Sequence, residues 1–192
     1  MNTYSLPTSI TIGDKERKIR NSADYRVILT VLEISRDEDL SPYERIFLSL
    51  KTFFADGDNT FKVSEVNDAH KSMSEFIDMH DSDYSCRNKP QRDRKPITDY
   101  VQDFPLYVGA VNAVLGYDIR RDEPTHWFTF INAHREIRND CTYSKVLEIR
   151  DKKMRGQKLE KWEQQYIHEN PHLFELRIWY TKEEWEFLNE ED

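Results

Sequence analysis

Apolar side chains are densest in the middle of the chain, over residues 104–115, where only three positions are not apolar. A helix that is apolar on every face is buried, so this stretch is predicted to be a core helix. Asp103 can cap its free N–H groups, Pro105 suits its first turn, and Gly116 suits the left-handed residue that ends a helix. A membrane span takes roughly 20 apolar residues. The stretch is too short for one.

A second helix of this central pair is predicted to begin near Thr125. Its apolar residues recur at spacings that place them on one broad stripe. They are Trp127, Phe128, Phe130, Ile131 and Ile137.

The N-terminal residues alternate between apolar and polar over positions 8–12, and a second extended run covers positions 15–20. Gly13-Asp14 between them can form a tight turn, so the pattern predicts a β-hairpin. An isolated hairpin is only marginally stable, and we expect it to pack on helices.

Three helices are predicted to follow the hairpin, at about residues 23–36, 42–54 and 64–80. Ser41 and Glu44 form the signature of a capping box at the start of the second of these helices. Its predicted buried face consists of Ile46, Phe47, Leu50, Phe53 and Phe54.

Helical patterns also occur after the central pair, around residues 143–150 and 159–168. The run over residues 174–180 fits either a strand or a docking segment. Thr181 and Glu184 then form a second capping-box signature. The fold class predicted from these patterns is mainly α, a compact helical domain with a small N-terminal β-hairpin.

The predicted organisation is one helical domain with its hairpin over residues 1–170, followed by a C-terminal extension, residues 171–192, with a short acidic helix. Residues 81–96 contain two prolines, several bases and almost no large apolar side chains, which is typical of a mobile loop. The bases of this loop could touch nucleic acid or an acidic partner, but a solvated linker is the simpler interpretation.

Charge and cysteine content narrow the function classes. The formal net charge is −8, so a phosphate backbone would be repelled over most of the surface and nucleic acid is a poor candidate for the main ligand. Cys86 and Cys141 lack the spacing of a disulfide framework or zinc site, and the N-terminus lacks a signal pattern. A cytoplasmic, reduced protein is the expectation.

Candidate chemistry is sparse. The six histidines do not match the spacing of a helical zinc site, and no phosphate loop, nucleophile elbow or Cys-His pair can be assembled. We therefore expect no catalytic, metal or cofactor site and no enzyme activity. Weak candidates for partner binding are C-terminal aromatic residues, since Trp and Tyr dominate interface hot spots. Core packing accounts for them equally well. They are Trp162, Tyr166, Trp179 and Trp185.

Three passages resemble a small siphophage family named for the fifteenth gene product of a Listeria phage. The first is the N-terminal Leu-Pro hairpin with the passage Ser22–Val27, SADYRV. The second is an acidic residue before FPLYVGAVNAVLGYDI, followed by His126-Trp127 at the next helix. The third is the pattern of Lys145, Val146, Leu147 and Arg150.

This resemblance covers about residues 1–170 and implies a tail assembly chaperone in the cytoplasm of the host bacterium. Such a chaperone coats the tape measure protein and brings tail tube subunits, the major tail protein, to it. Self-association is a further option, and no membrane or cofactor is implied. The alternatives are a structural tail component that stays in the virion, and a non-catalytic regulatory or nucleic-acid-associated phage factor.

Overall fold

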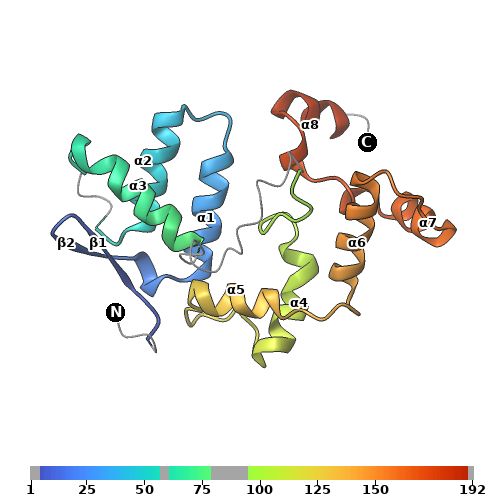
Figure 1. Ribbon diagram of the computed structural model, residues 1–192, viewed down its shortest axis with the longest axis horizontal. Coiled ribbons are helices and arrows are strands. Elements are labelled where there is room, and N and C mark those ends of the chain that lie inside the picture. The colour runs from blue at the N-terminus through green and yellow to red at the C-terminus, as the bar shows by residue number, and fades with distance from the viewer. Residues whose placement is uncertain (1–4, 57–60, 79–94, 190–192) are drawn as a thin grey trace. The chain divides into compact units, whose positions relative to one another are not determined.

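The computed structural model describes residues 5–56, 61–78 and 95–189, and it is mainly helical with one N-terminal hairpin, as predicted (Figure 1). The elements in chain order are β1 (Ser9–Ile12), β2 (Lys15–Lys18), η1 (Arg20–Ser22), α1 (Tyr25–Arg36), α2 (Pro42–Phe53), α3 (Val63–Ile77), α4 (Phe104–Leu115), α5 (Trp127–Arg135), α6 (Thr142–Met154), α7 (Lys161–Glu169), η2 (Pro171–Leu173), η3 (Arg177–Trp179) and α8 (Lys182–Asn189). The loop predicted over residues 81–96 lies outside the described residues except for Lys95 and Pro96.

The chain divides into two compact units. The first contains Met1–Pro90 and Arg120–Asn132, and the second contains Gln91–Ile119 and Ala133–Asp192. Helix α5 therefore begins in the first unit, and its last residues belong to the second. This division does not test whether residues 1–170 fold as one domain, which stays a prediction.

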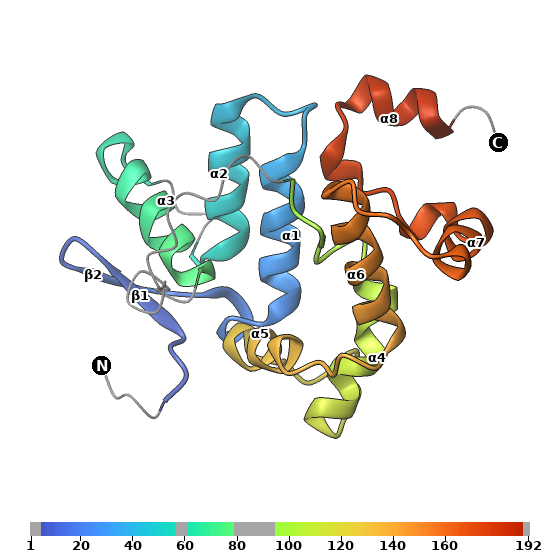
Figure 2. The same ribbon diagram turned by 45° about the vertical axis from the view of Figure 1, so that its right-hand side comes forward.

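In the first unit the hairpin pairs β1 and β2 antiparallel and packs on α3 (Figures 1 and 2). Gly13 in its turn has a φ of 57°, a conformation that glycine adopts without steric cost. Arg17 on β2 stacks 4.2 Å from the centroid of Phe61 and pairs with Asp56 at 2.9 Å. The hairpin is thus held by α3 and by residues that lie between α2 and α3, as its marginal intrinsic stability requires.

The predicted capping box opens α2: the Ser41 hydroxyl accepts from the Glu44 N–H, and the Glu44 carboxylate accepts from the Ser41 N–H at 2.9 Å. The other end of α2 is capped from a distance by Arg20. Its guanidinium donates to the carbonyl oxygens of Lys51, Thr52 and Phe54 at 3.0 to 3.2 Å. Both ends of this helix therefore have partners for backbone groups that the helix itself leaves unpaired.

One predicted face is wrong in part. Leu50, Phe53 and Phe54 of the α2 region are buried, but Phe47 is 40% exposed and belongs to the outer face of the helix. Helical spacing alone did not separate the edge of the stripe from its centre.

In the second unit α4 lies beside α6 (Figure 2). Gly116 ends α4 with a φ of 76°, as predicted. The prediction that α4 is buried on every face is wrong: Tyr107, Val108 and Val111 are buried, whereas Val114 is 42% exposed. Other segments of the chain pack against only part of the surface of this apolar helix.

A hydrophobic cluster closes the C-terminal part of the second unit. Val146 and Ile149 of α6 pack with Phe174, and half-buried apolar residues of α4, α7 and η2 cover them. The run over residues 174–180, for which a strand was one interpretation, contains η3 instead. The predicted capping box follows, with the Thr181 N–H donating to the Glu184 carboxylate at 2.9 Å.

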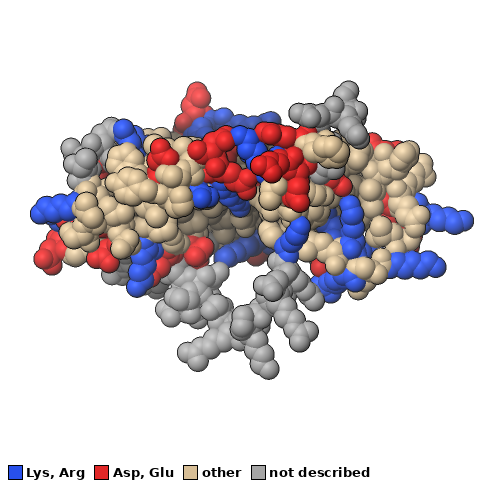
Figure 3. All heavy atoms as spheres, turned by 90° about the horizontal axis from the view of Figure 1, so that it is seen from above, with Lys and Arg blue, Asp and Glu red and all other residues tan. Residues whose placement is uncertain are grey.

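One face of the molecule carries both positive and negative side chains. On the face drawn in Figure 3, Lys and Arg side chains are interspersed with Asp and Glu side chains. No helix in the described part of the chain has the length and apolar character needed to cross a bilayer.

Candidate functional site

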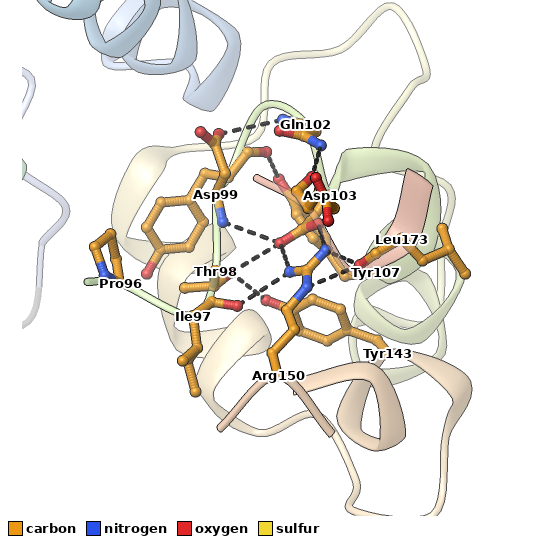
Figure 4. Close-up of polar contacts among 12 residues, drawn as sticks. Pro96, Ile97, Thr98, Asp99, Gln102, Asp103, Tyr107, Tyr143, Arg150 and Leu173 are labelled. Carbon is orange, nitrogen blue, oxygen red and sulfur yellow. Dashed lines mark hydrogen bonds and ion pairs between the residues drawn. The ribbon is translucent and has the colours of Figure 1, made fainter. Parts of the chain in front are cut away.

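The second unit is built around a buried polar network between the start of α4 and the end of α6 (Figure 4). Asp103 precedes α4, and its carboxylate meets the guanidinium of Arg150 in two contacts of 2.8 Å. Both side chains are 1% exposed. Asp103 was predicted to cap α4, but its side chain makes no capping hydrogen bond there and instead holds Arg150.

Arg150 has acceptors for its whole guanidinium. Besides Asp103 it donates to the Leu173 carbonyl oxygen through Nε at 2.8 Å and to the Ile97 carbonyl oxygen at 3.0 Å. A second donor also reaches Leu173 O at 2.5 Å. A guanidinium that is buried and saturated in this way has no donor left for a phosphate or carboxylate ligand. Its role is to join three parts of the second unit: the approach to α4 (residues 97–103), helix α6 and the η2 region.

The approach to α4 is itself shaped by a carboxylate. Asp99, which is 4% exposed, accepts from the N–H groups of Val101 and Gln102 at 2.8 and 3.2 Å. The Asp99 N–H donates in turn to the Asp103 carboxylate at 2.9 Å. These bonds close a local turn that presents Asp103 to Arg150.

The network continues from Asp103 towards α5. The Thr98 hydroxyl lies 2.6 Å from the Tyr143 hydroxyl, which lies 3.0 Å from His134 Nε2. Three tyrosine rings surround the imidazole edge-on, with centroid distances of 5.0, 4.9 and 5.4 Å to Tyr100, Tyr107 and Tyr143. Burial lowers the pKa of His134 to about 4, so its ring is neutral near pH 7. Burial also raises the pKa of Tyr143 well above its usual value.

The first unit contains a second junction of this kind, a buried polar network in which the turn before α1 meets the start of α5. Residues Asn21, Ser22 and Ala23 all have positive φ values, between 48° and 61°, and turn the chain sharply before α1. Asp24 follows, 1% exposed, and its carboxylate accepts from the Arg26 N–H at 2.8 Å as the cap of α1.

This turn holds the start of α5. The Asp24 carboxylate accepts from the Thr125 N–H at 2.9 Å, and the Ala23 carbonyl oxygen accepts from the Trp127 N–H at 2.8 Å. The buried Trp127 indole donates to the Ile77 carbonyl oxygen at the end of α3, at 2.8 Å. The polar residues of both junctions thus form hydrogen bonds within the chain, and their role is structural.

Histidine 126 belongs to the same junction. Its Nδ1 accepts from the Phe128 N–H at 3.0 Å, and its Nε2 lies 2.9 Å from the Pro7 carbonyl oxygen. Burial lowers the pKa of His126. Among the described residues, no group of His, Cys, Asp and Glu side chains is arranged to hold a metal ion.

The four predicted partner-binding residues lie on three different elements of the second unit. Trp162 and Tyr166 are one turn apart on α7, Trp179 lies in η3, and Trp185 lies on α8. Helix α7 brings the first two to neighbouring positions.

Their exposure differs. Trp162 is 51% exposed, and its indole donates to the Glu160 carboxylate at 2.7 Å. Tyr166 is half-buried against Phe174, with ring centroids 5.7 Å apart. Trp162 is therefore the accessible member of the α7 pair.

Trp179 and Trp185 are also half-buried. The Trp179 indole donates to the Pro96 carbonyl oxygen at 2.7 Å, and the Lys95 ammonium donates to the Trp179 carbonyl oxygen at 2.7 Å. The Trp185 ring lies 5.9 Å from that of Tyr180. Both indoles thus have neighbours within the second unit, as the core-packing alternative requires.

A small cavity opens beside Lys95. It has a volume of about 370 Å³ and is lined by Lys95, Ile97, Asp151, Met154 and Arg155. Arg155 and Asp151 pair with each other at 2.8 Å. Because its charges are largely engaged within the protein, the cavity offers little to fix a ligand. Of this set, only Lys95 belongs to the basic loop predicted over residues 81–96. Asp151 and Met154 lie on α6, Arg155 follows its last residue, and Ile97 lies before α4.

The model of one protein family, Bacteriophage Gp15 protein, matches residues 3–176 of the chain. No curated protein and no solved structure matches the chain significantly. The matched range includes both junctions. Some of the residues on which the resemblance rests, among them Asp24, Asp103 and Arg150, form buried hydrogen bonds there. The chain belongs to the bacteriophage Gp15 protein family.

Proposed function

We propose that this protein is a tail assembly chaperone, which binds the tape measure protein of its phage in the host cytoplasm and assists assembly of the tail tube. The observation that carries the proposal is membership of a bacteriophage protein family over residues 3–176. The proposal involves binding alone and needs neither a cofactor nor a bond-breaking step.

The surface of the second unit is compatible with such binding. On α7 the half-exposed Trp162 stands one turn from Tyr166, and an amphipathic partner helix presents apolar residues at matching spacings. A large rigid side chain contributes much contact area while losing little conformational entropy. Trp162 is therefore the first choice among the four C-terminal aromatic residues, and Trp179 and Trp185 come second.

The charge of the protein supports a role in keeping a partner in solution. A net charge of −8 makes copies of the protein repel one another at moderate salt. A complex coated with such copies would stay dispersed while its apolar segments are covered.

The test is co-expression with the tape measure protein encoded in the same phage genome, followed by size-exclusion chromatography. A soluble complex that disappears when this protein is omitted supports the proposal. The proposal fails if the tape measure protein aggregates to the same extent with and without it. The same chromatography run with the major tail protein tests the second partner.

A second measurement distinguishes a chaperone from a structural tail component. Mass spectrometry of purified phage particles should detect the tail proteins but not this chain. Its presence in stoichiometric amounts would favour a component retained in the virion.

Replacing Trp162 with Ser in the co-expression experiment, with the half-buried Trp179 replaced in parallel, tests only the choice of binding surface.

A further inference from the structure

Helix α2 presents two large aromatic side chains to solvent. Tyr43 is 68% exposed and Phe47 is 40% exposed. They lie one turn apart with their rings nearly parallel, at a centroid distance of 6.4 Å and an angle of 11°. Ser49, Leu50 and Phe53 occupy the buried side of the same helix. The stacked pair therefore forms a continuous apolar ridge on the outer face of the first unit.

The chain that leads into this ridge is acidic. The connection from α1 to α2 carries Asp37, Glu38 and Asp39, and Glu44 follows in the first turn of α2. Over residues 36–51 these four carboxylates stand against three bases, Arg36, Arg45 and Lys51, so the net charge is −1 and the carboxylates lie at the N-terminal end of the ridge. Glu38, Asp39 and Glu44 are exposed. The hydrogen bond from Ser41 lowers the pKa of Glu44, which keeps that carboxylate ionised near pH 7.

We propose that Tyr43 and Phe47, together with the acidic α1–α2 connection, form a docking surface for an amphipathic helix that carries basic residues beside its apolar stripe. The proposal rests on the proposed function and adds, in the first unit, a second docking surface for a helical partner besides Trp162 on α7. The aromatic ridge fits between apolar residues spaced at i and i+3 or i+4 on such a helix.

The charges decide between partners. Carboxylates beside the ridge attract a helix with Lys or Arg at its rim and repel an acidic one. A twofold contact between copies of this chain places the same surface, with the same net negative charge, on both sides. A basic helix is therefore a better occupant than a second copy.

The direct test uses two synthetic helical peptides of about 18 residues, or five turns. Both have the same leucine stripe, and one carries lysine and the other glutamate at the remaining positions. Fluorescence anisotropy measures their binding to the intact chain. The lysine peptide should bind and the glutamate peptide should not. Equal binding of both peptides, or of neither, would overturn the proposal.

Variants locate the surface. Tyr43→Ser with Phe47→Ser should weaken binding of the lysine peptide by about tenfold or more, as expected for hot-spot aromatics. Glu38→Lys with Asp39→Lys should weaken it and reduce its salt dependence. The matched control is Val63→Ser on α3, because Val63 is 89% exposed in the same unit and should have no effect. All three variants should keep the helical circular dichroism spectrum of the parent, since each changes exposed side chains.

The surface and the proposed function can fail separately. If the chain holds the tape measure protein and the Tyr43→Ser, Phe47→Ser variant does so equally well, the surface is wrong while the chaperone function stands. If the chain does not hold the tape measure protein at all, the chaperone function is wrong, and the peptide assay still decides whether the ridge binds a basic helix.

Discussion

Asp103 and Arg150, 47 residues apart in the chain, pair through two contacts of 2.8 Å between carboxylate oxygens and guanidinium nitrogens (Figure 4). Neither side chain is accessible to solvent to any appreciable extent. A buried ion pair recovers the cost of removing its charges from water only if its remaining donors and acceptors are also satisfied. Here backbone groups of Ile97, Asp99 and Leu173 satisfy them.

Replacing Arg150 with Met should therefore destabilise the protein by about 3 to 5 kcal/mol, because the variant leaves the Asp103 carboxylate buried without its counter-ion. Urea denaturation followed by circular dichroism measures the loss. Arg138→Met is the matched control, since the Arg138–Asp140 pair has side chains 82% and 68% exposed and should be worth less than about 1 kcal/mol.

The double variant Asp103→Leu, Arg150→Met separates the pair from its surroundings. It removes both charges, so its loss of stability should be smaller than the sum of the two single losses. Additive losses would contradict a direct interaction between the two side chains.

A second prediction concerns the faces of α4. Val111 is fully buried, so Val111→Asp places an unpaired carboxylate in an apolar environment and should unfold the second unit. Val114→Asp on the same helix is the control, because Val114 is 42% exposed and the new carboxylate can remain hydrated. Thermal unfolding followed by circular dichroism distinguishes the two. Similar melting temperatures would contradict the observed orientation of α4.

The pattern of apolar residues predicted α4 itself correctly but not its surroundings. A helix that is apolar on all sides has no periodicity to indicate which face has neighbours, and the number of elements packed around it is a tertiary property. Phe47 was predicted to be buried for a different reason, because its spacing fits the edge of the buried stripe of α2.

Capping motifs were more informative, because they depend on residues only three positions apart. Ser41 with Glu44, and Thr181 with Glu184, form the predicted hydrogen bonds. Asp103 resembles an N-cap in sequence, yet its carboxylate is used by a residue on α6. A local signature cannot reveal a competing partner far along the chain.

The aromatic candidates show a similar limit. The amino-acid sequence did not distinguish Trp162, which is half-exposed, from Trp179 and Trp185, which are half-buried. Exposure depends on segments such as Lys95 and Pro96, whose contacts with η3 join residues more than eighty positions apart.

A third prediction concerns Asp24, which caps α1 and also holds the start of α5. Asp24→Ala removes the acceptor for the N–H groups of Arg26 and Thr125, and should cost about 2 to 3 kcal/mol. Ser41→Ala removes an exposed cap with only local contacts and should cost about 1 kcal/mol or less. Urea denaturation compares the two, and equal losses would contradict a role for Asp24 beyond capping.

A fourth prediction concerns the backbone turn before Asp24. Ser22 is exposed and has a φ of 55°, which is costly for a β-branched residue and freely accessible to glycine. Ser22→Val should lower the free energy of unfolding by roughly 1 to 2 kcal/mol, whereas Ser22→Gly should leave it unchanged or raise it. Thr30→Val, at an exposed site within α1, controls for the helix propensity and size of valine. A neutral Ser22→Val would show that the turn can change its conformation.

The last prediction is a pH dependence of stability that comes from His134. Burial lowers its pKa in the folded protein to about 4, below the ordinary value of 6.5. Between these two values the unfolded chain binds more protons than the folded chain, so stability is complete above about pH 6.5 and falls as the pH drops towards 4. Because the ring is half-buried, we expect its contribution to be roughly 1 to 3 kcal/mol.

His134→Gln removes the titrating group while keeping a polar side chain that can reach the Tyr143 hydroxyl. The variant should lose part of the decrease in stability between pH 6.5 and 4.5, measured by urea denaturation at a series of pH values. Part of the slope should remain, because burial also lowers the pKa of His126 and acts in the same direction. His168→Gln, at an exposed position on α7, controls for the general effect of replacing histidine with glutamine. An unchanged slope in His134→Gln would mean that the imidazole is hydrated in the folded protein, and that the ring of tyrosines around it opens in solution.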